Sequence, residues 1–321
     1  MKRVFLLPIL FCCLVACNNN SSKKESKFVN NLISPKSCIT YEQDLVIPEE
    51  YFFFKSINTN AFLSTLATNV LTGKDIVVYQ PFSKTDTYDK ETITNIFGAI
   101  DTKEYHTILF DEEWALDTAQ FIMKKKVNSY SLVRQFNRQT VDGEIIPTKS
   151  VIASFNFTGE IDSVTTKGCK LLESNVAYEV PFVNEENPEF LDRMQVHHVA
   201  KTILDKALCG NIQSYSFSYR DTLLVREQDE VKESLGEGVV CYTNEDEEGN
   251  VDTLCVEQKA DIQEITGLAF IEDWYINEST MEIVKIIKGI APVRTYYHFV
   301  ENSEPELVKS IPFVMYLNST E

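Results

Sequence analysis

Hydrophobic positions recur at helical spacing in two distant segments of this 321-residue chain. The first segment starts at Asn60 and ends at Gly73, and its apolar face consists of Phe62, Leu63, Leu66, Val70 and Leu71. The second starts at His198 and ends at Gly210, with apolar residues at the matching offsets Val199, Ala200, Ile203, Ala207 and Leu208. A strand-like run follows each glycine. The pattern therefore predicts a helix that leads into a strand in both places.

Similar elements follow both helix–strand segments in the same order. Residues 89–98 and 228–236 each have the pattern of a second, shorter helix that ends at glycine. Residues 108–136 and 268–299 then each read as a strand, a turn and a longer strand. The chain thus contains the same succession of elements twice.

We interpret this succession as an internal duplication, in which Trp114 aligns with Trp274 and Val133-Arg134 aligns with Val293-Arg294. Strand-rich units with few helices predict an α+β fold. In this fold each of two repeated halves is a mainly antiparallel sheet with one or two helices packed on one face. We expect the two similar halves to pack against each other.

The predicted repeat divides the chain into five parts. They are a lipoprotein signal peptide at 1–16, a lipidated cysteine and polar tether at 17–47, a first half at 48–157, a connection at 158–180 and a second half at 181–321. The mixed composition of the connection leaves open whether it adds edge strands to a sheet.

The N-terminus has the pattern of an export signal. Basic residues precede an apolar run from Val4 to Ala16 that is too short to span a bilayer. The run ends in Leu14-Val15-Ala16-Cys17, which resembles the lipobox of bacterial lipoproteins. We expect cleavage before Cys17 and acylation of its thiol, which would anchor the chain in a lipid bilayer. The alternative is an ordinary signal peptide that happens to contain cysteines.

The charge of the chain argues against binding to nucleic acid. It has 48 acidic and 30 basic side chains, for a net charge of −18. Phosphate backbones require clustered Lys and Arg, and the one dense cluster, Lys124-Lys125-Lys126, is expected to lie on a solvated strand edge. Only 11 glycines are present, and no phosphate-binding loop is recognisable.

Cys241 and Cys255 are candidates for a disulfide bond. They lie in two strand-like runs that flank a polar turn, and both are equally distant from Glu248 at its tip. Cysteines that face each other across a hairpin can reach bonding distance, and export would favour oxidation. Two buried thiols are the alternative.

Two acidic pairs precede the tryptophans, as Glu112-Glu113-Trp114 and Glu272-Asp273-Trp274. Adjacent side chains of a strand point to opposite faces, so the two carboxylates of a pair diverge instead of converging on a substrate. No His, Cys or acidic residues stand at a metal-binding spacing. We therefore predict no catalytic residue, no metal and no cofactor.

Residues 271–293 resemble the C-terminal motif of the GldN/PorN family of gliding motility proteins. The matching elements are an acidic-Asp-Trp-aromatic turn at Glu272, Asp273, Trp274 and Tyr275, and a strand that ends in Gly-Ile-Ala-Pro at 289–292. The resemblance implies a non-enzymatic periplasmic component of the type IX secretion and gliding apparatus of Bacteroidota. Members of that family assemble with a lipoprotein partner into rings under the outer membrane.

Two features depart from the family pattern. The chain has its own lipobox cysteine, and EEYFFFKSIN replaces the Trp-Arg motif that precedes the first helix in the family. We therefore expect a divergent lipoprotein member that is attached to the outer membrane and faces the periplasm. Its expected partners are the bilayer, through acylated Cys17, proteins of a secretion or motility complex, and further copies of itself.

Four residues are candidates for contact with a protein partner: Trp114, Asp273, Trp274 and Tyr275. Aromatic side chains are favoured anchors at interfaces, and they are equally favoured in cores. A lipoprotein that binds glycan or peptide through exposed aromatics is the alternative function. A hydrolase that uses the paired carboxylates ranks third.

Overall fold

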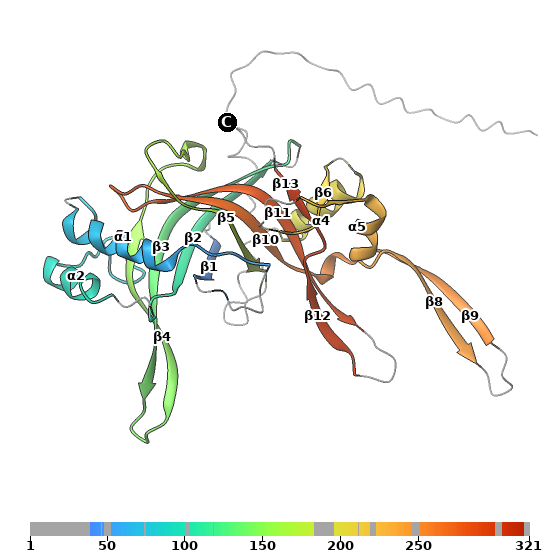
Figure 1. Cartoon of the computed structure of the whole chain (residues 1–321), viewed down its shortest axis with the longest axis horizontal. Coiled ribbons are helices and arrows are strands. Elements are labelled where there is room, and N and C mark those ends of the chain that lie inside the picture. The colour runs from blue at the N-terminus through green and yellow to red at the C-terminus, as the bar shows by residue number, and fades with distance from the viewer. Residues whose placement is uncertain are drawn as a thin grey trace, which may run out of the picture.

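A computed structural model of the chain describes residues 39–45, 47, 53–73, 75–100, 103–117, 119–182, 196–210, 212–218, 223–245, 251–298 and 304–317. Its strands are mainly antiparallel and its helices few, so the predicted α+β class is confirmed (Figure 1). None of the described helices combines the length and apolar character needed to cross a bilayer. The predicted signal peptide, Cys17 and most of the predicted tether lie outside the described residues.

The first half of the chain forms a four-stranded antiparallel sheet in sequence order. Its strands are β1 (Ile39–Asp44), β2 (Thr107–Asp117), β3 (Ile122–Gln139) and β4 (Ile145–Asn156). The helices α1 (Thr59–Thr72) and α2 (Lys90–Phe97) pack on this sheet, because the ring of Phe62 contacts Tyr130 and that of Phe97 contacts Phe155. Asn58 and Asp89 cap the two helices by accepting hydrogen bonds from backbone N–H groups.

The second half forms a larger, seven-stranded antiparallel sheet. Its order is β5-β10-β11-β13-β6-β7, and β12 pairs with the far end of β11. The strands are β5 (Lys170–Pro181), β6 (Ser214–Tyr215), β7 (Val225–Arg226), β10 (Ile265–Ile276), β11 (Ile283–His298), β12 (Glu306–Ser310) and β13 (Val314–Tyr316). The helices of this half are α4 (Val196–Leu208) and α5 (Gln228–Ser234). The four helices predicted from the hydrophobic pattern are thus confirmed.

The central hairpins of the two sheets have the same register. Tyr41 of β1 faces Phe110 of β2, and Tyr178 of β5 faces Phe270 of β10. Each long hairpin has a bulge just before the buried glutamate, Glu112 in β2 or Glu272 in β10. Equivalent positions in these hairpins lie 160 residues apart (272 minus 112), with no insertion between them.

Strands lie in two segments that flank the expected first half. The segment 158–180, whose role the sequence leaves open, supplies an edge strand to the second sheet. Strand β1 falls within the expected tether at 17–47, and β5 falls largely within the expected connection at 158–180. Each is the strand that pairs with the first strand of its central hairpin. The apolar periodicity of β1 is too short to be recognised in sequence, and β5 carries many polar residues on its exposed positions.

One continuous core lies between the two sheets. The buried cluster includes residues of β2, β3, β10 and β11 together with the apolar faces of the helices. Aromatic rings meet edge to face across the boundary, with centroids 5.1 Å apart for Trp114 and Phe270 and 5.4 Å apart for Phe110 and Trp274. The halves therefore share this core, and a second, smaller buried cluster lies in the second half around Ala269, Ile271 and Ala291.

A third, two-stranded sheet projects from the second half. It consists of β8 (Gly238–Glu245) and β9 (Val251–Gln258), and we refer to residues 238–258 as the β8–β9 arm (Figure 1). The arm lies between α5 and β10. In the first half, α2 is followed by β2 with only residues 98–106 between them, and no arm occurs there.

Candidate functional site

Two glutamates lie side by side in the core, at the centre of the molecule. Glu112 of β2 and Glu272 of β10 have no solvent exposure. Their neighbours Glu113 and Asp273 point to the opposite faces of the strands and are partly exposed. The two acidic pairs thus diverge as predicted from strand geometry, and one carboxylate of each pair is buried.

Each buried glutamate pairs with a lysine from the other half of the chain. Lys125 of β3 places its Nζ 2.8 Å from Oε1 of Glu272, and Lys285 of β11 places its Nζ 2.7 Å from Oε1 of Glu112. All four side chains are fully buried. Reciprocal pairing of this kind is the pattern of an interface between two subunits related by a twofold axis. Here it occurs within one chain.

Two tyrosines join the ion pairs into one network. The hydroxyl of Tyr178 donates a hydrogen bond to Glu272 at 2.8 Å and accepts one from Lys125 at 3.0 Å. Lys285 donates to the hydroxyl oxygen of Tyr41 at 2.9 Å, and the two hydroxyl oxygens are 3.1 Å apart. The strands β1 and β5, which supply these tyrosines, therefore complete the site.

Each of the two tryptophans donates a hydrogen bond to the buried glutamate of its own half. The indole Nε1 of Trp114 donates to Glu112 at 2.8 Å, and that of Trp274 donates to Glu272, also at 2.8 Å. Both indoles are fully buried. They are therefore not available for a partner in this structure, and the expectation that Trp114 and Trp274 lie at an interface needs correction.

Aromatic faces surround the two ammonium groups. Nζ of Lys125 lies 3.1 Å from the ring centroid of Phe270, and Nζ of Lys285 lies 3.3 Å from that of Phe110. A cation over an aromatic face is stabilised by the ring quadrupole, most strongly when water is excluded. The rings thus partly offset the cost of desolvating both lysines.

The network favours the charged form of Glu112. Burial opposes ionisation of Glu112, but the nearby Lys285 and Lys125 outweigh it and lower the pKa of that carboxyl. Burial lowers the pKa of Lys285 to about 8, against the opposing attraction of Glu112. Burial, followed by the charge of Glu272, raises the pKa of Tyr178 well above its usual value, so its hydroxyl keeps its proton.

This arrangement holds the two sheets in position, and its charged groups are not accessible to a substrate. The carboxylates and ammonium groups are fully buried, and the two tyrosine hydroxyls are hydrogen-bonded to them. Breaking one partner of a buried ion pair is costly, and a reciprocal set of pairs fixes how two sheets can face each other. Among the described residues, no group of three or more His, Cys, Asp and Glu residues is placed to hold a metal ion.

The two remaining candidates for partner contact lie on the outer face of β10. Asp273 accepts a hydrogen bond from the backbone N–H of Asn175 at 2.9 Å and lies 3.4 Å from Nζ of Lys288. Tyr275 is partly exposed. Asp273 therefore links β10 to β5 and β11, and Tyr275 is the more accessible of the two.

The lysine triplet was wrongly expected to be a solvated strand edge. Lys125 and Lys126 are both buried, and Lys125 faces Trp114 across the β2–β3 ladder. Lys285 faces Trp274 in the same way. The signal was present in the sequence, because alignment of the tryptophans also aligns these two lysines.

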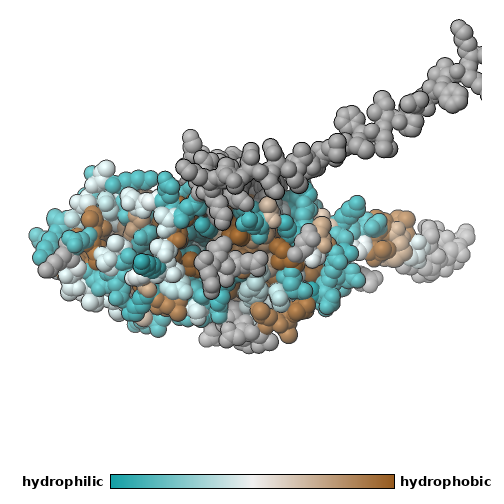
Figure 2. Space-filling model, turned by 90° about the horizontal axis from the view of Figure 1, so that it is seen from above, coloured by the Kyte–Doolittle hydropathy of each residue, from teal (hydrophilic) through white to brown (hydrophobic). Residues whose placement is uncertain are grey.

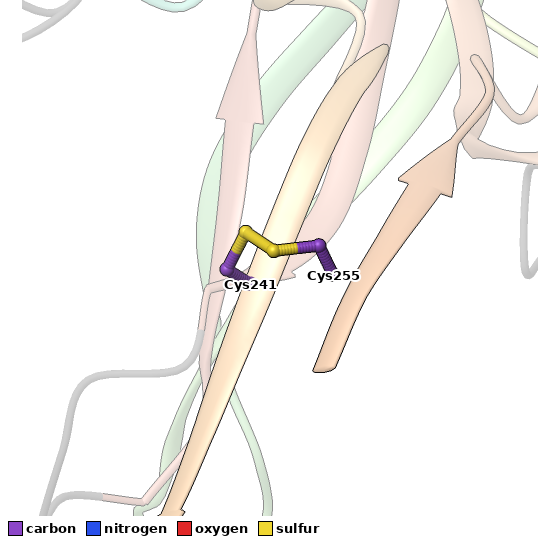
Figure 3. The surroundings of a disulfide bond; sticks show 2 residues. All are labelled: Cys241 and Cys255. Atoms are coloured by element: carbon purple, nitrogen blue, oxygen red, sulfur yellow. A yellow bond between two sulfur atoms is a disulfide. The ribbon is translucent and has the colours of Figure 1, made fainter. Parts of the chain in front are cut away.

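The β8–β9 arm holds the disulfide that its sequence suggested. Cys241 and Cys255 are register partners with Cα atoms 3.9 Å apart, and their sulfurs are bonded (Figure 3). Cys169 and Cys209 are free thiols, and Cys209 is exposed. The disulfide cross-links the two strands of the arm.

Comparison with protein families identifies the second half. A family model described as gliding motility associated protein GldN matches residues 173–318. This region of the chain belongs to the GldN family. It contains nearly all of β5 and every later strand and helix, so the predicted resemblance is confirmed. No curated protein matches the chain.

The GldN region contains one half of the buried network. Glu272 and Lys285 lie inside it, whereas their partners Lys125 and Glu112 lie in the first half, outside the matched residues. In this chain the first half therefore supplies the counterions of the GldN region.

Proposed function

We propose that this protein is a non-enzymatic component of a gliding motility or type IX secretion complex, held at the outer membrane by an acylated cysteine and facing the periplasm. The observation that carries this proposal is the GldN family match over residues 173–318, which covers the second sheet and its helices.

The chemistry of the core supports a structural role. A general acid or base must reach its substrate, and Glu112 and Glu272 are fully buried and paired with lysines. Stacking on a sugar requires an exposed aromatic face, and both tryptophans are buried. Neither the hydrolase nor the glycan-binding alternative is favoured by these residues.

Membrane attachment is the second element of the proposal, and Cys17 is its proposed site. The chain between Cys17 and β1 would give the body a short polar tether, because residues 18–31 have almost no apolar content. Attachment through lipid would keep the body next to the membrane in which a secretion complex assembles.

A genetic experiment tests the proposal. The gene would be deleted in its host and restored as the original sequence, as Cys17→Ala, or as Cys209→Ala, which removes an exposed thiol as a matched control. Colony spreading and the release of type IX cargo proteins would be measured, together with the size of the tagged complex in detergent extracts.

Deletion should impair spreading or cargo release, and Cys17→Ala should release the protein from the membrane fraction and reproduce that defect. Cys209→Ala should behave like the original chain. Normal spreading and cargo release in the deletion strain, with the tagged protein recovered only as a monomer, would refute the proposed function.

A further inference from the structure

No described residue of the β8–β9 arm belongs to the shared core. Its two strands pair only with each other in the described part of the chain, from Gly238↔Gln258 to Glu245↔Val251. Every residue from 253 to 258 is exposed. Both outer edges of the hairpin are open, and no described element packs on either of its faces (Figure 1).

An unsupported hairpin needs a brace to persist in water. An isolated two-stranded hairpin is at best marginally stable, because it buries little apolar surface. The Cys241–Cys255 bond joins the strands at their centre and removes much of the freedom of the open form. The disulfide therefore stabilises a hairpin that is not part of either main sheet.

The arm has exposed apolar side chains, and its sequence is strongly acidic. Leu254 and Val256 lie on one face and are 61% and 46% exposed, and Val239 on the other face is 68% exposed. Figure 2 shows hydrophobic surface on this projection at the right end of the molecule. Residues 237–259 contain one basic residue, Lys259, and seven acidic ones: Glu237, Glu245, Asp246, Glu247, Glu248, Asp252 and Glu257.

We propose that the β8–β9 arm is a docking element for a partner protein that presents a Lys- and Arg-rich surface with apolar side chains among the charges. This inference rests on the proposed function and names the part of the molecule that carries the contact. The open strand edges can add a partner strand, and the acidic side chains would select a basic one.

Charge favours a basic protein over the other surfaces that the arm could bind, which are a membrane and a second copy of the chain. An anionic membrane surface would repel a segment whose sequence has seven acidic residues and one basic residue. A second copy of the chain is itself strongly acidic, with a net charge of −18, so two copies repel each other at low salt. A basic protein surface with apolar side chains would be attracted by the acidic charge and would bury the exposed apolar residues of the arm.

Photo-crosslinking in the native cell envelope tests the proposal. A benzophenone amino acid would replace Leu254 in the full-length tagged chain, and crosslinked peptides would be identified by mass spectrometry. A benzophenone at Val141, which is fully exposed in the turn between β3 and β4, is the matched control in the half that lacks the arm.

The expected result is an adduct from Leu254 to a Lys- and Arg-rich segment of a different protein, absent from the Val141 control. Glu257→Lys should lower its yield about fivefold by weakening the charge complementarity. The double variant Cys241→Ser/Cys255→Ser should lower the yield as much, while the melting temperature of the body stays unchanged.

Four outcomes overturn the proposal: no adduct, an adduct only to another copy of the chain, an adduct only to lipid, or equal adducts from both positions. The size of the complex in detergent extracts distinguishes failure of the docking proposal from failure of the proposed function. If a large complex is still recovered in detergent extracts, the arm has no docking role and the assembly function stands. If no complex is recovered either, both proposals fail.

Discussion

The two halves of the molecule agree in the residues that hold them together and differ in those that project outward. Arg134 binds Glu104 at 2.7 Å in the first half, and Arg294 binds Glu264 at 2.7 Å at the equivalent place in the second. The buried lysines, glutamates and tryptophans follow the same spacing. The β8–β9 arm, in contrast, is present in the second half alone among the described residues. The comparison separates a shared scaffold from an added element.

The largest effect is expected from removing one charge of the network. Lys125→Met leaves Glu272 buried without a counterion, which should lower the free energy of unfolding by about 3–5 kcal/mol. Lys285→Met should cost a similar amount if the two halves are equivalent. Urea unfolding followed by circular dichroism measures both.

The double variant Lys125→Met/Glu272→Leu is the control for this prediction, because it removes both charges of one pair. It should recover most of the lost stability. A cost below about 1 kcal/mol for either single lysine variant would show that its pair does not hold the halves together.

A smaller effect is expected when only the indole hydrogen bonds are removed. Trp114→Phe and Trp274→Phe each take one N–H donor from a buried carboxylate and should cost about 1–3 kcal/mol. Denaturant unfolding of both variants compares the two halves directly. A large difference between them would show that the halves carry unequal shares of the shared core.

The pH dependence of stability tests the Glu112 side of the network. The pKa of Glu112 is lowered in the folded state from its ordinary value of 4.5, so the stability from this carboxylate is present above that value. It is lost as the pH falls through the folded pKa. Glu112→Gln should therefore flatten the loss of stability on acidification below about pH 5. Glu113→Gln, on the outer face, is the matched control for thermal unfolding across this range.

The smallest effect on the body is expected from opening the arm. Cys241→Ser/Cys255→Ser removes a bond between cysteines 14 positions apart, and no described residue between them belongs to the core cluster. The unfolding free energy of the body should change by less than about 0.5 kcal/mol. Hydrogen exchange of the amides at 253–258 should become much faster. A fall in the stability of the whole body would contradict the view that the arm is independent of it.

Local pattern was sufficient to predict the elements with strong periodicity. The helical faces around Leu63 and Ile203, the two long hairpins and the cysteine pair all depend on residues close together in the chain. The GldN resemblance depended on Trp274 and its neighbours, which form one such hairpin.

The local sequence around Lys125 does not reveal that its charge is buried. Lys125 lies between two other lysines, and only its alignment with Lys285 distinguishes it from a surface residue. Its burial follows from the packing of β3 against the other sheet, where Glu272 supplies the counterion. Strand β1 was missed for a related reason, because a strand of six residues gains its partners only from distant parts of the chain.

The contact between Tyr41 and Lys285 bears on the order in which the protein folds. These residues are 244 positions apart, so β1 meets this partner only when nearly the whole chain is present. Long-range closure of this kind is slow, because the intervening chain must be ordered before the contact is gained. The N-terminal half would therefore remain incompletely folded until the GldN region is present to complete it.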